Sequence, residues 1–153
     1  MKKLLSYGLT LSVLLFLSAC TTPDMGSPFG KKVKKEYFTG GALKSELILD
    51  DASGQNGVLK QYGYNGKLTS TVQMHNGVKD GMETLYDGHG RVLRLTPYIN
   101  GRKNGVLKVL YPNGDILAAI TYKNNTKDGK AVKYNKDGSI NEQAMFQHGK
   151  RID

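Results

Sequence analysis

The stretch that decides the fold is His75–Gly90, HNGVKDGMETLYDGHG, which contains four glycines in sixteen residues. It includes two turn sequences, NGVKDG and YDGHG. Asn-Gly and Asp-Gly pairs favour tight hairpin turns, because these turns need residues with positive φ. A phosphate-binding loop would instead need a glycine-rich stretch between a strand and a helix, followed in the P-loop by Lys and Ser or Thr. No such string occurs in the sequence, so we interpret the glycines as turn residues.

The same pattern recurs every 24 residues along the chain. Three glycine columns and one tyrosine column keep this period: Gly57, Gly81, Gly105 and Gly129; Gly66, Gly90, Gly114 and Gly138; Gly77, Gly101 and Gly149; and Tyr62, Tyr86 and Tyr134. Asn125 replaces the glycine missing from the third column, and asparagine is among the non-glycine residues that best tolerate positive φ. A period of this length indicates a repeat architecture in which each unit packs against its neighbours.

The segment after the second glycine of each unit alternates like a strand. Its even positions are Leu43, Ser45, Leu47 and Leu49; Leu68, Ser70, Val72 and Met74; Val92, Arg94, Thr96 and Tyr98; Ile116, Ala118, Ile120 and Tyr122; and Ile140, Glu142, Ala144 and Phe146. Apolar residues in the first, third and fourth columns predict one buried face at period two. The predicted fold is therefore all-β: an extended antiparallel meander of tandem 24-residue β-hairpin repeats in a single curved sheet, with an N-terminal signal helix.

The first 19 residues have the features of an export signal, with Lys2 and Lys3 followed by an apolar run. Residues 17–20, Leu-Ser-Ala-Cys, resemble the bacterial lipobox, which implies a diacylglycerol on the Cys20 thiol. Lipid burial contributes about 0.8 kcal/mol per methylene, so two or three acyl chains would hold the protein on a membrane. Thr21 follows in place of the aspartate that resembles an inner-membrane retention signal, so the resemblance implies the periplasmic face of the outer membrane. We expect a signal peptide (1–19), a flexible linker (20–35) and a repeat domain (36–153).

The units, G-x-x-x-x-Y-x-x-x-G followed by a strand and N-G-x-K-D-G, resemble the bacterial variant of the MORN repeat over about residues 36–153. This resemblance implies a binding or scaffolding module in the cell envelope. Some proteins built of such repeats resemble the YwqK-like antitoxin repeat family, so a membrane-anchored immunity protein is the alternative. An immunity protein usually opposes a basic toxin with an acidic face, whereas this chain has a formal net charge of +9. We therefore expect the scaffolding or binding role.

The sequence contains no recognisable catalytic or metal-binding constellation. His75, His89 and His148 are not spaced like the ligands of common metal sites. The single cysteine is assigned to the lipid, and no nucleophile elbow or opposed pair of carboxylates can be identified. We expect no enzymatic activity, no metal, no cofactor and no nucleic-acid partner.

A column of cations is the first candidate binding site. Lys79, Lys103, Lys127 and Arg151 recur at the 24-residue period and would place one positive charge per repeat along one edge of the sheet. Such a stripe suits an anionic surface, either lipid headgroups or an acidic envelope polymer. The alternative is a set of solvated turn residues that Asp80 and Asp128 partly neutralise.

The second candidate binding site is apolar. Leu93, Leu95 and Leu117 occupy odd positions of the middle units, where the flanking units have polar residues. If these leucines share one exposed face, they form a docking patch for a protein partner, because contiguous exposed apolar area usually marks an interface. The other interpretation is that the sheet curls over them.

Overall fold

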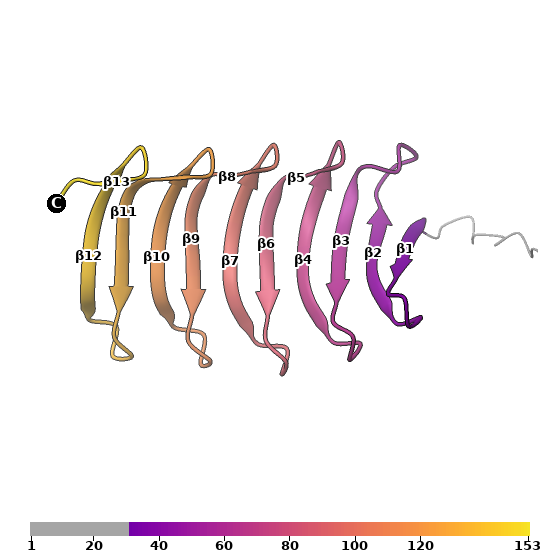
Figure 1. The fold of residues 1–153 in the computed structure, drawn as a ribbon, viewed down its shortest axis with the longest axis horizontal. Coiled ribbons are helices and arrows are strands. Elements are labelled where there is room, and N and C mark those ends of the chain that lie inside the picture. The colour runs from indigo at the N-terminus through magenta and orange to yellow at the C-terminus, as the bar shows by residue number, and fades with distance from the viewer. Residues whose placement is uncertain (1–30) are drawn as a thin grey trace, which may run out of the picture.

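The computed structural model describes residues 31–153, so the expected signal helix and Cys20 lie outside the described residues. Within this range the chain forms one open antiparallel sheet of 13 strands (Figure 1). This confirms the predicted all-β meander. No helix among the described residues has the length and apolar character needed to cross a bilayer.

The strands follow one another across the sheet in almost strict chain order. Their bounds are β1 Val33–Tyr37, β2 Leu43–Leu49, β3 Gly57–Tyr62, β4 Leu68–His75, β5 Val78–Lys79, β6 Gly81–Tyr86, β7 Val92–Ile99, β8 Arg102–Lys103, β9 Gly105–Leu110, β10 Ile116–Lys123, β11 Thr126–Tyr134, β12 Ile140–Gln147 and β13 Lys150–Arg151. The two-residue strands β5 and β8 pair only with β4 and β7, at the ends of their hairpins. In the next unit the corresponding segment continues without a break as the first part of β11.

The turns of the NGVKDG kind have positive φ at both central residues, as the hairpin signal predicts. Asn76 and Gly77 have φ of 50° and 75°, and Asn124 and Asn125 have φ of 48° and 69°. Asn125 therefore adopts the conformation of the glycine that it replaces. His148 takes the asparagine position of the last turn with φ of 48°. Two consecutive residues of this kind match the twist of the flanking strands.

These turns are tied to one another from repeat to repeat. The Gly101 N–H donates to the Lys79 carbonyl oxygen (2.8 Å), and the Asn125 N–H donates to that of Lys103 (2.9 Å). The Gly149 N–H completes the series by donating to the Lys127 carbonyl oxygen (2.9 Å). The backbone of each lysine in the cation column is thus held by the turn of the following unit.

Register places two rows of side chains on the same face of the sheet. The first row is Ser45, Gln61, Ser70, Leu85, Arg94, Val109, Ala118, Lys133 and Glu142. The second row is Leu47, Leu59, Val72, Glu83, Thr96, Leu107, Ile120, Ala131 and Ala144. Most of the buried side chains belong to these rows, so we call this face the inner face and the opposite one the outer face.

The first apolar column does not lie on the inner face, contrary to the sequence prediction. In the third of the five units Arg94 pairs with Leu85 while Val92 pairs with Tyr86, which leaves Leu93 as an extra residue. Such a β-bulge reverses the alternation of side chains on either side of it. The tyrosine column confirms the reversal, because the Tyr86 hydroxyl lies 3.4 Å from that of Thr71 on the outer face.

The sheet is a single layer among the described residues, and its core is correspondingly thin. The buried hydrophobic residues are Leu49, Val72, Leu107, Val132 and Ala144. All but Val132 belong to the inner-face rows or continue their alternation. Stability in such an array comes mainly from the contacts between neighbouring repeats, which extend along the sheet.

Candidate functional site

The cation column lies on the inner face, next to a column of large apolar side chains. Register pairs Met74 with Lys79, Tyr98 with Lys103, Tyr122 with Lys127 and Phe146 with Arg151. Members of a pair lie opposite each other across a tight turn, so both side chains project from the same face. The 24-residue period and the turns thus bring together all four cations proposed from the sequence.

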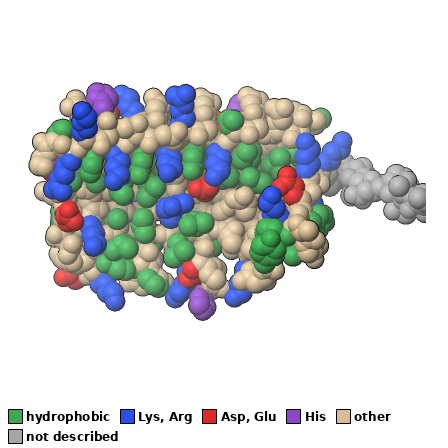
Figure 2. All heavy atoms as spheres, viewed as in Figure 1, with side chains coloured by type: hydrophobic (Ala, Val, Ile, Leu, Met, Phe, Trp, Pro, Cys, Tyr) green, Lys and Arg blue, Asp and Glu red, His purple; other side chains and the backbone are tan. Residues whose placement is uncertain are grey.

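Each of the three lysines lies over the aromatic ring of the next repeat. Their Nζ atoms are 5.1 Å from the ring centre of Tyr98 for Lys79, 5.4 Å from that of Tyr122 for Lys103, and 4.9 Å from that of Phe146 for Lys127. We call these six residues the lysine–aromatic ladder. Figure 2 shows a row of Lys and Arg side chains that runs across the strands and alternates with hydrophobic side chains. Contacts of this geometry are attractive, by about 0.5–1 kcal/mol at exposed sites.

Lys79, the first lysine of the ladder, is paired with a buried acidic residue. Lys79 forms an ion pair with Glu83, whose side chain is 8% exposed. The same carboxylate lies 4.0 Å from Arg94 Nη2 and accepts a hydrogen bond from the Tyr98 hydroxyl at 3.5 Å. Burial and, after it, the Glu83 charge raise the pKa of Tyr98, so this hydroxyl stays protonated and remains a donor. Lys79, Glu83, Arg94, Thr96 and Tyr98 form what we call the Glu83 cluster.

The last cation of the column is also paired. Arg151 lies 3.6 Å from a Glu142 oxygen and 3.1 Å from an oxygen of Asp153. Between these ends, neither Lys103 nor Lys127 has a carboxylate oxygen within 4.0 Å among residues 31–153. The two central lysines are therefore the ones whose charge is available to a partner.

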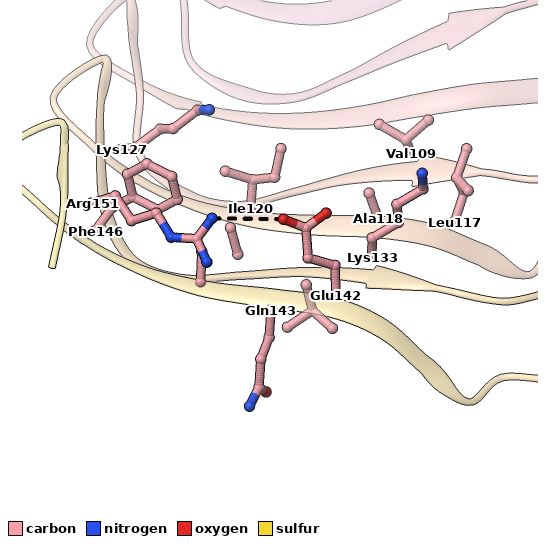
Figure 3. A pocket seen from close by; sticks show the side chains of 13 residues that line it. Val109, Leu117, Ala118, Ile120, Lys127, Lys133, Glu142, Gln143, Phe146 and Arg151 are labelled. Atoms are coloured by element: carbon pink, nitrogen blue, oxygen red, sulfur yellow. Dashed lines mark ion pairs between the residues drawn. The ribbon is translucent and has the colours of Figure 1, made fainter. Parts of the chain in front are cut away.

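An open hollow lies on the inner face beside Lys127, with a volume of about 320 Å³. Its floor is apolar and is formed by Val109, Ile120, Ala131, Ala144 and Phe146, with cations at its rim. Figure 3 shows Phe146, Ile120 and Val109 on the same side of the strands as the Arg151–Glu142 ion pair, whereas Gln143 points to the other side. The hollow and the ladder thus form one continuous surface.

The structure does not bring the three candidate leucines together as one row. Leu95 lies on the outer face between Thr84 and Lys108. Leu93 and Leu117 are the extra residues at their bulges. Leu117 lines the hollow and in Figure 3 points to the same side as Val109. All three side chains are half-buried.

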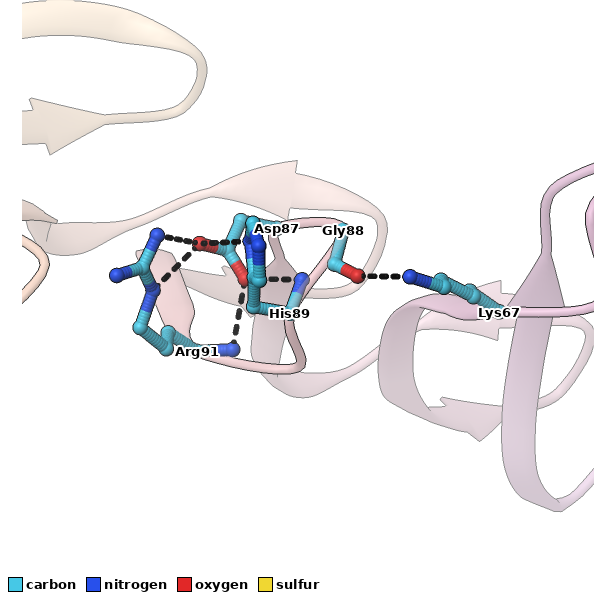
Figure 4. A network of polar contacts seen from close by, with 5 residues as sticks. All are labelled: Lys67, Asp87, Gly88, His89 and Arg91. Carbon is cyan, nitrogen blue, oxygen red and sulfur yellow. Dashed lines mark hydrogen bonds and ion pairs between the residues drawn. The ribbon is translucent and has the colours of Figure 1, made fainter.

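The three histidines lie in or next to turns, and Asp87 stabilises the turn that contains His89. Asp87 accepts hydrogen bonds from the backbone N–H groups of His89 (2.8 Å) and Arg91 (2.9 Å) and pairs with the Arg91 guanidinium (Figure 4). These bonds, the backbone bond of Arg91 first, lower the pKa of Asp87 to about 2. No cluster of three or more His, Cys, Asp or Glu side chains suited to a metal ion exists in the part of the chain that the structure describes.

Comparison with known proteins identifies a MORN repeat variant at residues 103–124, which spans Lys103 and Tyr122 of the ladder. MORN repeats are non-catalytic modules that generally take part in binding or scaffolding. No curated protein matches the chain. The fold and the matched unit therefore define an open repeat sheet that carries a MORN repeat variant.

Sequence reasoning placed the cations in one row but missed their neighbours. The contact between Lys103 and Tyr122 joins two repeats, so it could not be inferred from spacing within one repeat. The two-residue turn could have revealed that the lysines and the aromatic residues share one face of the sheet, because it places Tyr98 opposite Lys103. Glu83 was overlooked because its column otherwise contains Leu59, Leu107 and Ala131.

Proposed function

We propose that the protein is a non-enzymatic binding module that presents the inner face of its repeat sheet to an anionic partner. The observation that supports this most is the display of Lys103 and Lys127 on one open face, each over an aromatic ring and neither paired with a carboxylate among the described residues. A regular array of this kind suits an extended or multivalent partner, because several weak contacts add along one line.

We further propose that the module is attached to the cell envelope by acyl chains on Cys20. The lipobox-like residues 17–20 support this, and Thr21 supports the outer membrane, with the repeat sheet in the periplasm. Eleven residues from Cys20 to Lys31 reach at most about 35–40 Å when fully extended. The sheet would therefore meet only partners at or near the membrane surface.

The test is capture of the partner in its native setting. Cells that produce the full-length protein are treated with a photoactivatable crosslinker that does not depend on amines, the envelope is solubilised, and the crosslinked species are identified by mass spectrometry. We expect a discrete partner with the wild type and with Lys136→Gln, a control on an exposed turn. The doubly substituted Lys103→Gln, Lys127→Gln protein should lose it. Capture of the same species by an unrelated lipoprotein would contradict the proposal.

A membrane-anchored immunity protein is the alternative role. It predicts one tight complex with a toxin and protection of cells that produce the protein. Charge argues against a basic toxin as the target of the inner face, because the charged side chains without an ion pair there, among residues 31–153, are cations such as Lys103 and Lys127. Survival of cells challenged with the product of a neighbouring toxin gene, with and without this protein, would distinguish the two roles.

A further inference from the structure

We propose that the lysine–aromatic ladder binds an extended acidic peptide segment that crosses the strands and carries a carboxylate at every third residue. The proposal deepens the binding role proposed above, since it names the chemistry and the spacing of the partner. It depends on three observations: the distance between successive lysines, the coverage of the aromatic rings, and the hollow beside Lys127.

The spacing of the lysines follows from the sheet. Successive lysines are separated by two strands, and strands lie about 4.8 Å apart, so the cations recur about every 9.6 Å. A polyproline II segment rises about 3.1 Å per residue with three residues per turn, so every third side chain faces the same way about 9.3 Å further on. In a β-strand, by contrast, the side chain three residues further on points to the opposite face. A helix matches less well, with residues seven apart separated by about 10.5 Å.

The aromatic rings favour a peptide over a sugar polymer. Stacking of sugar rings needs free aromatic faces, but one face of each of Tyr98, Tyr122 and Phe146 already carries a lysine ammonium group 4.9–5.4 Å from the ring centre. A ligand that approaches the ladder therefore meets positive charge first. Because the rings already restrain the lysines, less side-chain freedom is lost on binding.

The pairing of the cations limits the motif to two carboxylates. Glu83 holds Lys79, and Glu142 and Asp153 hold Arg151, so within residues 31–153 Lys103 and Lys127 are the members of the cation column that provide free charge. The minimal ligand is therefore two acidic residues with two residues between them. Next to Lys127 the floor of the hollow, with Ile120 and Ala131, accepts an apolar side chain from the same segment.

Fluorescence anisotropy with full-length protein in detergent micelles tests the proposal. The probes are two labelled proline-rich nonapeptides of identical composition, one with glutamates at positions 1, 4 and 7 and the other at positions 1, 3 and 5. We expect the first peptide to bind at least about fivefold more tightly. Lys103→Gln and Lys127→Gln should each weaken its binding about five- to tenfold, the usual cost of a lost charge contact in a partly exposed site. Lys103→Arg should preserve most of the affinity, and Lys136→Gln should leave it unchanged.

Equal affinity for the two peptides would overturn the proposal, and so would an equal loss with Lys136→Gln, since either result means non-specific attraction. Stronger competition by an anionic oligosaccharide or by a helical peptide with glutamates seven residues apart would also overturn it. Unfolding curves of each variant show whether a loss of binding reflects a loss of fold. If the double lysine substitution abolishes capture of the crosslinked partner but the two peptides bind equally, the binding role stands and the ladder proposal fails.

Discussion

On the inner face, equivalent positions of neighbouring repeats form a polar cluster at one place and an apolar hollow at another. The column that contains Glu83 continues with Leu107 and Ala131, and the backbone register around these residues is the same. At Glu83 the lysine of the ladder is neutralised. Ala131 is short and uncharged, so Lys127 has no ion-pair partner among the described residues and a hollow opens beside it. One repeated backbone thus supports two surfaces that differ only in a few side chains.

The two regions also differ in how they contribute to stability. In the Glu83 cluster two buried polar atoms, Arg94 Nε and Thr96 Oγ1, have no hydrogen-bond partner among the residues described. An unsatisfied buried group costs about 1–3 kcal/mol, and a buried ion pair often adds little net stability. The hollow has no such cost but leaves apolar surface exposed. The comparison predicts that breaking the ion pairs of the Glu83 cluster destabilises the fold, whereas removing its unpaired hydroxyl or filling the hollow stabilises it.

The largest effect is expected from Glu83→Ala, which removes the central acid of the polar cluster. Lys79 and Arg94 then lose their common partner, and a cavity replaces the carboxylate. We expect the free energy of unfolding to fall by about 2–3 kcal/mol. This is less than for a fully buried ion pair, because a third of the Lys79 side chain is exposed. Urea denaturation at neutral pH measures it. Glu83→Leu, which copies Leu107 of the next repeat, should recover part of the loss; a change below about 0.5 kcal/mol for alanine would contradict the role of the cluster.

Thr96→Val is expected to stabilise the Glu83 cluster. Thr96 is 1% exposed and its hydroxyl is unpaired, while Val72 occupies the equivalent position of the preceding unit at 2% exposure. Valine has nearly the same shape, so the fit is retained and the unsatisfied hydroxyl disappears. We expect a gain of about 1 kcal/mol in the free energy of unfolding. A loss of stability would mean that the hydroxyl is satisfied in solution.

Ala131→Leu should fill the hollow with a side chain like that of Leu107, which occupies the same column of the preceding repeat. Partial burial of the added carbons should raise stability by about 0.5–1 kcal/mol. The same change should weaken binding of the spaced acidic peptide, because the site for its apolar side chain is occupied. Thermal unfolding and anisotropy measure the two effects. Destabilisation by more than about 1 kcal/mol would show that the hollow cannot accept a larger side chain.

Much of the fold could be predicted because the turns are specified locally. The repeated glycines and Asn125 fix positive φ at constant intervals, and this determines a meander of hairpins. The assignment of faces failed where one extra residue enters each long strand. Leu93 and Leu117 lie at these bulges, and the reversal of alternation depends on pairing with the preceding strand. The cation column was predictable from period alone, whereas its aromatic partners and Glu83 depend on packing between repeats.

The smallest effect is expected in the turns of the YDGHG kind, at the ends of the strands away from the ladder. Here too equivalent positions of different repeats differ in charge. Asp87 occupies a column that otherwise contains Gly63, Tyr111 and Asn135, so among these four turns this one has a carboxylate at that position. Its folded-state pKa is lowered from 3.8 to about 2, chiefly by the Arg91 backbone bond. A lowered pKa means that the carboxylate stabilises the fold above about pH 4 and that this contribution disappears as the pH falls through 2.

Asp87→Asn copies the turn with Asn135 and keeps an oxygen that accepts backbone bonds while removing the charge. At pH 7 we expect Tm to fall by about 1 °C, because half of the Arg91 side chain is exposed and a partly exposed ion pair is weak. The difference between the two proteins should shrink as the pH is lowered from 4 to 2, measured by circular dichroism. Asn135→Asp provides the reverse control, since it adds a carboxylate to a turn without an arginine and should gain little at pH 7. A difference that stays constant down to pH 2 would mean that the charge of Asp87 does not stabilise its turn.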